Sequence, residues 1–334
     1  MTEWFVQNQK PVLEENLELS RCLMEYWKQH AQYLKRADTE KRNARYWMEE
    51  FTGWKVKDIR PANQREFLRK LVDKGYTKGT AESVFKTGAA AIRFAWRNDM
   101  LLNQLPLLSA AKELEKLGAG SVERWRAMDV EEIARLIEGA GTERLIRFII
   151  ILIGTGCRPG AALDLSGSQI DLDQGTIQLL VEGEKQTNKY RPVVRLPSFL
   201  RGIYHPENLV EQASVAGRNN KTRYDNLRRS WKTARKRAGL DDLVTPYSIR
   251  HSVAKWLRAH SVDAWSVSGQ LGHRKKGAEI TEVYASSDPG YLEHPLSSIE
   301  AMFDEILQLS PRAQKLVKEQ RTTTSYSKTT ITEK

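Results

Sequence analysis

Cysteine is scarce in this chain of 334 residues, which contains only Cys22 and Cys157. Two cysteines cannot build a disulfide framework or a cysteine-rich zinc site. Long apolar runs are also missing: residues 145–153 are interrupted by Arg147 and fall far short of the ~20 residues that a membrane span needs. The first residues have neither a basic flank nor an apolar stretch, so we expect no secretion signal. These absences predict a soluble, intracellular protein with no membrane attachment.

Positive charge, by contrast, is in excess. The chain has 53 Lys and Arg against 42 Asp and Glu, a net charge of +11. Such an excess favours a polyanionic partner, above all nucleic acid. Eight basic residues lie in segment 221–237, where only Asp225 offsets them, and its apolar positions recur at helical spacing. The residues of this helix that we expect to contact DNA phosphates are Arg228, Lys232, Arg235 and Lys236.

A second candidate for phosphate binding lies in the first half of the chain. Thr77, Lys78 and Thr80 precede or begin a predicted helix over 80–98, where free backbone N–H groups and hydroxyls suit a phosphate. An ordinary helix-capping turn explains the same residues equally well, and the sequence leaves both interpretations open.

The chain divides by pattern into two domains. Its length suits two domains at roughly 150 residues each. Helical periodicity runs through the first half, while Pro106 and the Gly-Ala-Gly of residues 118–120 indicate a linker. The expected parts are an N-terminal extension (1–13), a helical DNA-binding domain (14–105), a linker (106–127), a second domain (128–310) and a basic flexible tail (311–334).

The second domain predicts a small sheet among helices. Segments 176–181 and 192–197 alternate as strands do, and the polar turn 182–189 joins them as a hairpin. The fold class is therefore mainly α with a small antiparallel β-sheet (α+β).

Several motifs of the second domain place polar residues where a plain core would not. They are Arg158 after Thr-Gly-Cys, Lys185 and Lys189 in the hairpin turn, Tyr247 and Arg250 in Pro-Tyr-Ser-Ile-Arg-His, His273 after Leu-Gly, and Tyr284 after Thr-Glu-Val. No single motif is specific, but their order and spacing resemble those of the tyrosine recombinases, the phage integrase family. The resemblance covers about 128–310. Residues 14–100 are similar to the core-binding domain of that family in pattern only.

The resemblance implies a role for each of these residues. Arg158 and Arg250 would hold the scissile phosphate, Lys185 would be the general acid, His273 would also contact the phosphate, and Tyr284 would be the nucleophile. Lys189 is the alternative general acid. His251, which follows the second arginine, is either a supporting residue or a solvated histidine.

The chemistry agrees with that assignment. Two guanidinium groups can neutralise the charge on the nonbridging phosphate oxygens without a metal. Nearby cations favour the phenolate of a tyrosine, whose ordinary pKa is about 10. The sequence has no GxxxxGK[ST] motif and no carboxylate cluster, so we expect no cofactor and no metal.

The chain also departs from the family pattern. Tyr247 stands where the family usually has His or Lys, which predicts reduced or unusually tuned activity. Ala161 stands where an acidic residue is common, with Asp164 nearby, and the loss is expected to affect packing more than chemistry.

The predicted function is that of a site-specific recombinase or integrase of a mobile element, which cuts and rejoins DNA through a 3′-phosphotyrosyl intermediate. The alternatives are a catalytically weak or inactive DNA-binding relative and a type IB topoisomerase. The expected partners are double-stranded DNA and further copies of the chain, from dimer to tetramer. The stripe of a last helix over 296–309 packs either on its own domain or on a neighbouring protomer. In a bacterium such a protein would be cytoplasmic and associated with the nucleoid.

Overall fold

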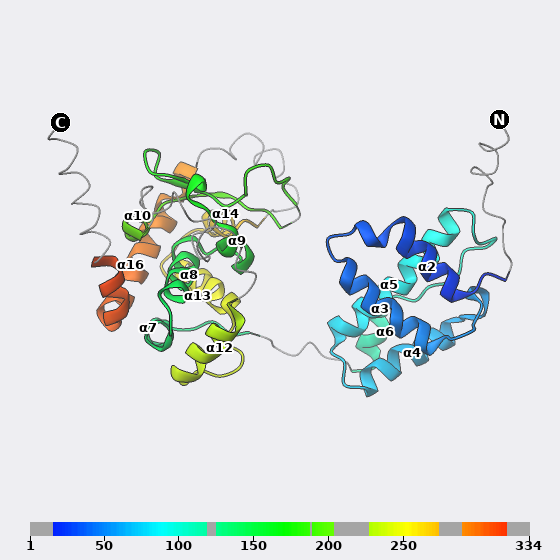
Figure 1. The fold of residues 1–334 in the computed structure, drawn as a ribbon. Helices are drawn as coiled ribbons and strands as arrows, with labels where there is room; N and C mark the ends of the chain where they lie inside the picture. Colours follow the sequence, from blue (N-terminus) through cyan, green and yellow to red (C-terminus); the bar gives the residue numbers. More distant parts are fainter. Residues whose placement is uncertain (1–15, 119–124, 188, 204–226, 274–288, 319–334) are drawn as a thin grey trace, which may run out of the picture. The chain divides into compact units, whose positions relative to one another are not determined.

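The computed structural model describes residues 16–118, 125–187, 189–203, 227–273 and 289–318 (Figure 1). The chain forms two compact units, Met1–Val122 and Glu123–Lys334. The boundary between them falls within the stretch 106–127, which the sequence indicates as a linker. Among the described residues, no helix combines the length and apolar character needed to cross a membrane.

The first unit is a cluster of helices. Its elements are α2 (Leu19–Gln29), η1 (Ala31–Tyr33), α3 (Ala37–Glu50), η2 (Val56–Asp58), α4 (Pro61–Asp73), α5 (Lys78–Arg97) and α6 (Ala110–Lys116). The long α5 packs against α2, α3, α4 and α6. Trp47 of α3 is fully buried, and its indole N–H donates a hydrogen bond to the Val84 carbonyl at 2.8 Å. Gly88 faces this indole, and any side chain there would overlap it.

The first unit extends further along the chain than we predicted. Helix α6 lies within the expected linker, yet its Ala110 and Leu114 are buried in the core of the first unit. The buried amide of Gln64 fixes the approach to α6. Its Nε2 donates to the Pro106 carbonyl at 3.0 Å, and its Oε1 accepts from the Leu108 N–H at 3.0 Å.

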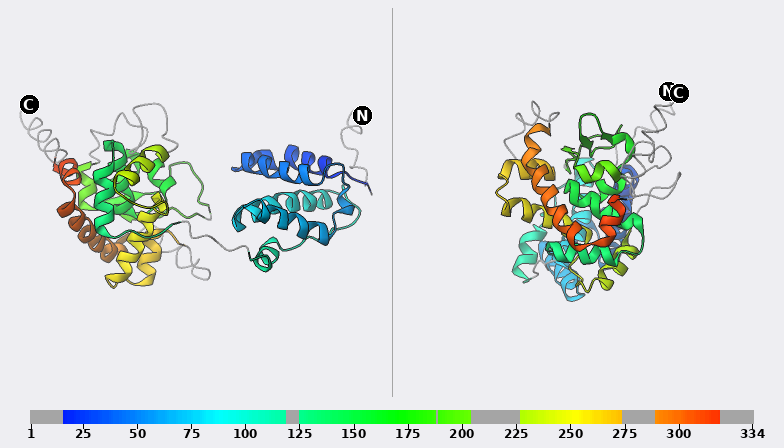
Figure 2. Two further views of the ribbon diagram at one scale, coloured as in Figure 1. Left: turned by 90° about the horizontal axis from the view of Figure 1, so that it is seen from below. Right: turned by 90° about the vertical axis from the view of Figure 1, so that its left-hand side faces the viewer.

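The second unit packs helices around an apolar central helix. Its elements are α7 (Val130–Gly139), α8 (Glu143–Thr155), α9 (Pro159–Asp164), η3 (Gly167–Gln169), β1 (Ile170–Asp171), β2 (Thr176–Gln178), β3 (Val193–Arg195), α10 (Ser198–Ile203), α12 (Arg228–Arg237), α13 (Pro246–Ala259), α14 (Ala264–Leu271), η4 (Pro289–Leu292) and α16 (Glu293–Leu309). Residues 149–153 of α8 have no exposed surface. Helices α13 and α16 pack directly on α8 (Figure 2).

The sheet has three short antiparallel strands in the order β1-β2-β3. Ile177 pairs with Ile170 on one side and with Val194 on the other. The two predicted strands form, although each is shorter than predicted, and β1 was not predicted because two residues carry no alternation. The mainly helical fold with a small antiparallel sheet is confirmed.

The end of the described chain corrects one expectation. Residues 311–318 are helical rather than flexible, and Ala313, Leu316 and Val317 are buried. Glu138 of α7 anchors this segment, because its carboxylate accepts hydrogen bonds from the Ser310 hydroxyl at 2.6 Å and the Arg312 N–H at 2.9 Å. The prediction of a flexible tail over 311–334 rested on the abundance of Thr, Ser and Lys. The short apolar pattern at the start of this stretch is too brief to stand out against that composition. Residues 319–334 lie outside the described residues.

The apolar stripe of α16 packs inside its own unit. Its members Ile299, Met302, Phe303 and Ile306 have at most 1% of their surface exposed. Of the two interpretations that the sequence left open, packing on its own domain is the one observed for this stripe.

Candidate active site

Arg250 lies at the centre of the site, on the second turn of α13. The helix begins after Thr245, whose N–H donates to the Ser248 hydroxyl at 3.0 Å, and Pro246 occupies its first position. The Arg250 side chain is buried, with 5% of the residue exposed. One of its Nη atoms donates to the Gly156 carbonyl at 2.9 Å, and the other lies 2.8 Å from Nε2 of His273.

Arg158 reaches the same place from the end of α8. That helix ends in a left-handed turn at Gly156, with φ of +61°. A side chain at Gly156 would press on Leu271 and Val253, so the glycine allows the turn to lie against α13 and α14. Arg158 is the residue just before α9, and its guanidinium donates to the Tyr190 carbonyl at 2.8 Å.

His273 follows α14, which begins at the capping carboxylate of Asp263 and ends at Gly272. Gly272 has φ of +63°, and a Cβ there would lie 2.8 Å from the Tyr190 carbonyl oxygen. The hairpin return therefore crosses directly over the glycine before His273. The structure thus brings together three segments far apart in the sequence, ending in Arg158, Arg250 and His273.

The charges of the site are unbalanced. No carboxylate of the described residues forms an ion pair with Arg158 or Arg250. Burial, and then the charge of Arg158, lower the pKa of Arg250 to about 10. Burial also lowers the pKa of His273, and the charges of Arg250, Arg158 and His251 lower it further. The His273 imidazole is therefore neutral at pH 7 and can accept the hydrogen bond from Arg250. An anionic group would relieve this crowding of cations.

The hairpin that carries the candidate general acids is held at its return strand. The Gln186 side chain joins the turn to the backbone of Arg191. Its Oε1 accepts from the Arg191 N–H at 3.1 Å, and its Nε2 donates to the Arg191 carbonyl at 2.7 Å. The Arg191 guanidinium donates to the Asp164 carboxylate at 2.7 Å, and the Asp164 side chain is only 3% exposed. Asp164 therefore supplies acidic support that Ala161 cannot. Lys185 and Lys189 are both exposed on this turn, and the choice between them stays a prediction.

Tyr247 lies one turn before Arg250 on α13 and is 43% exposed. Tyr247 is close enough to Arg250 to influence the pKa of the Arg250 guanidinium, and it is the second residue of α13. Tyr284, the predicted nucleophile, lies outside the described residues.

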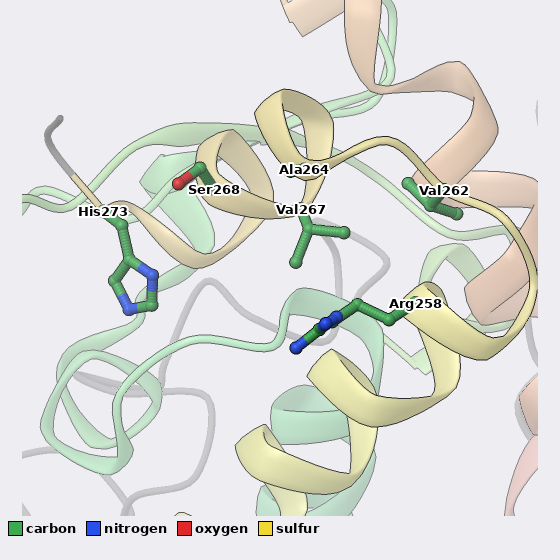
Figure 3. A pocket seen from close by; sticks show the side chains of 6 residues that line it. All are labelled: Arg258, Val262, Ala264, Val267, Ser268 and His273. Carbon is green, nitrogen blue, oxygen red and sulfur yellow. The ribbon is translucent and has the colours of Figure 1, made fainter.

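A cavity of about 250 Å³ adjoins His273 (Figure 3). Its lining residues are Arg258 of α13, Val262, then Ala264, Val267 and Ser268 of α14, and His273. Arg258 lies two turns after Arg250 on the same helix, so its guanidinium enters the hollow that His273 borders. Arg258 was not among the residues that the sequence indicated.

Helix α12 carries four of the predicted DNA-binding residues, of which three are exposed and one is buried. Arg228, Lys232 and Lys236 are exposed. Arg235 is buried, donates to the Asp242 carbonyl at 3.1 Å and forms an ion pair with the Asp242 carboxylate. Arg235 therefore lies on the packed side of the helix next to Ala234, and its contact with DNA stays a prediction.

The other predicted phosphate-binding turn begins α5. Thr77 is the residue before the helix, Lys78 is its first residue, and the hydroxyls of Thr77 and Thr80 lie 3.0 Å apart. Lys78 is partly exposed and Thr80 is exposed. The helix starts two residues earlier than predicted, and the turn is compatible with either interpretation.

These features define a class of protein: a two-unit, mainly helical chain with a cluster of cationic side chains that three distant segments of its second unit bring together. Residues 126–290 match the model of the phage integrase family. The chain is also 25% identical to the integrase of Salmonella phage P22 over 315 residues, which covers 83% of this chain and 78% of the integrase. It is 27% identical to the tyrosine recombinase XerA of Thermococcus kodakarensis, covering 72% of this chain and 81% of XerA. The region 126–290 of the chain belongs to the phage integrase family, and the relatives of the chain by sequence are integrases and tyrosine recombinases.

Solved structures share the fold. A lambda integrase dimer bound to a COC′ core site superposes with a TM-score of 0.63 at 16% identity, covering 84% of this chain and 78% of that one. The XerH site-specific recombinase bound to a palindromic difH substrate gives 0.58 at 19% identity and covers 84% of both chains.

Proposed function

We propose that this protein is a site-specific recombinase that cuts and rejoins DNA strands through a 3′-phosphotyrosyl intermediate on Tyr284. The observation that supports this most strongly is the meeting of Arg158, Arg250 and His273 around a site with unbalanced positive charge. Its relatives by sequence are integrases and tyrosine recombinases. Such a protein would act at the nucleoid of a bacterial cell.

In this mechanism the scissile phosphate binds between the two guanidinium groups. Both can donate to its nonbridging oxygens, which gain negative charge as the reaction proceeds. Phosphate binding also returns the pKa of Arg250 towards its ordinary value, because the anion offsets the charge of Arg158. The neutral His273 holds the Arg250 guanidinium in place and adds its own contact to the phosphate.

The chemical step is a transesterification that needs no metal. The phenol of Tyr284 gives its proton to solvent as its oxygen attacks the phosphorus, and the bond from phosphorus to the 5′ oxygen breaks. Lys185 donates a proton to that 5′ oxygen, with Lys189 as the alternative donor. The tyrosyl ester preserves a phosphodiester bond, so a 5′ hydroxyl from another strand can reverse the step and rejoin the DNA.

Recombination requires more than one copy of the chain. Solved relatives include a lambda integrase dimer bound to a core site and a tetramer bound to a Holliday junction. We propose that this chain likewise assembles on double-stranded DNA as a dimer to tetramer. In the single chain, the apolar stripe of α16 packs on its own unit.

The deciding experiment captures the covalent intermediate. The protein is incubated with a library of nicked duplexes that carry a randomised centre, and SDS-resistant protein–DNA adducts are isolated and sequenced. We expect adducts enriched in one sequence, and their loss in Tyr284→Phe. Salt-sensitive binding without any adduct would instead identify a non-catalytic DNA-binding relative. Adducts with no sequence preference would favour a topoisomerase.

The general acid is assigned with a second substrate. A 5′-bridging phosphorothiolate has a leaving group that needs no proton. We expect Lys185→Ala to cleave this substrate at close to the wild-type rate while failing on ordinary DNA. Lys189→Ala should cleave both substrates. The reverse pattern would make Lys189 the acid.

A further inference from the structure

Trp125 and His251 form a flat ring stack beside the candidate active site. Their ring centroids lie 3.3 Å apart, and the ring planes differ by 5°. His251 is the residue directly after Arg250 on α13 and is partly buried. Trp125 precedes α7, in the segment by which the chain enters the second unit, and is itself 43% exposed. One face of the partly exposed Trp125 indole thus packs on His251, the residue next to Arg250.

The residues after Trp125 are tied to the same region. The guanidinium of Arg126 binds both carboxylate oxygens of Glu132 at 2.7 Å, and its Nε donates to Asp241 at 2.6 Å. The Met128 N–H donates to the Ser252 hydroxyl at 2.7 Å. Two consecutive residues of α13, His251 and Ser252, therefore each receive a contact from the entering segment.

His251 is coupled to the site by charge as well as by position. Burial, and then Arg250, lower its pKa, so its ring is neutral at pH 7. The charge of a protonated His251 would also lower the pKa of His273. A stacked and uncharged ring adds no further positive charge to the crowded pair of guanidinium groups. A ring released to water would be free to turn and to take up a proton.

We propose that Trp125 is a positioning residue for strand cleavage, whose indole fixes the His251 ring and, through α13, the Arg250 guanidinium. This inference rests on the proposed function. We expect the stack to affect how the phosphate is placed between the guanidinium groups. A small displacement of a phosphate-binding group lowers the rate of cleavage more than the affinity for DNA.

The test compares variants of the full chain. Trp125→Ala removes the stack, and Trp125→Phe keeps a flat ring there. Arg126→Ala is the matched control, since it loosens the same segment without touching His251. We expect Trp125→Ala to slow adduct formation on the captured duplex about tenfold at saturating protein, with the Kd for DNA changed by less than about twofold. Trp125→Phe should recover most of the rate.

A second readout needs no DNA. NMR titration of ¹³C-labelled histidine, assigned with His251→Gln, reports the pKa of His251 directly. We expect this pKa to rise towards its ordinary value in Trp125→Ala and to stay unchanged in Arg126→Ala. If the wild type forms no adduct, the proposed function fails, while the titration still decides whether Trp125 controls His251.

The proposal is overturned by any of three results. The first is an unchanged His251 titration in Trp125→Ala. The second is an equal loss of cleavage in Trp125→Ala and Arg126→Ala with equal losses of melting temperature, which identifies a merely structural role. The third is a Trp125→Ala variant that cleaves at the wild-type rate.

Discussion

Removing the carboxylate of Asp164 should loosen the hairpin that holds Arg158. Breaking a buried ion pair from one side costs about 3–5 kcal/mol. The Asp164 side chain is 3% exposed, but that of Arg191 is 23% exposed and has Glu184 at 3.8 Å as a second partner. Water and Glu184 therefore replace part of the lost interaction, and we expect Asp164→Asn to lower the free energy of unfolding by about 2–3 kcal/mol.

Hydrogen exchange measures this loss in the second unit alone. The amides of residues 149–153 in α8 are fully buried and exchange only when the unit opens. A loss of about 2–3 kcal/mol speeds their exchange roughly 30- to 160-fold. Cleavage should fall in the same variant, because the Tyr190 carbonyl that binds Arg158 is adjacent to Arg191.

A double-mutant cycle separates the pair from its surroundings. Asp164→Asn with Arg191→Met should cost less than the sum of the single changes by about 1–3 kcal/mol. The control Glu184→Gln, at an exposed carboxylate, should stay within about 0.5 kcal/mol of the wild type. Additive losses, or an Asp164→Asn variant as stable as the control, would refute the view that this pair holds the hairpin.

Three further predictions follow from single contacts. His273 has a lowered pKa in the folded chain, so the unfolded chain takes up its proton first as the pH falls. The stability of the second unit should therefore hold above pH 6.5 and decline below it. His273→Gln lacks this decline, so the difference between its urea midpoint and that of the wild type should be constant above pH 6.5 and shrink below it. Lys232→Ala should weaken DNA binding and reduce its salt dependence, whereas Arg235→Ala should lower the melting temperature instead, as salt titrations and calorimetry would show. Gly88→Ala should destabilise the first unit by about 1–3 kcal/mol or more in urea unfolding, because the new methyl overlaps Trp47.

The features that the sequence determined by itself are local ones. Helical periodicity and the alternation of the strands each act over a few residues, and the structure has them close to where the sequence predicts. The order of the motifs was enough to indicate the family. The roles of Tyr284, Lys185 and Lys189 remain predictions from that order.

Only the tertiary structure decided which polar residues meet. Asp164 and Arg191 are 27 positions apart, and Arg250 meets the Gly156 carbonyl across 94 positions. Segments α6 and 311–318 looked like linker and tail because each is too short to show a period, and packing against a neighbouring core made them ordered. Periodicity records which face of a helix is apolar. The packing of the helices and strands into a core decides which distant groups come into contact. No local sequence pattern encodes that packing.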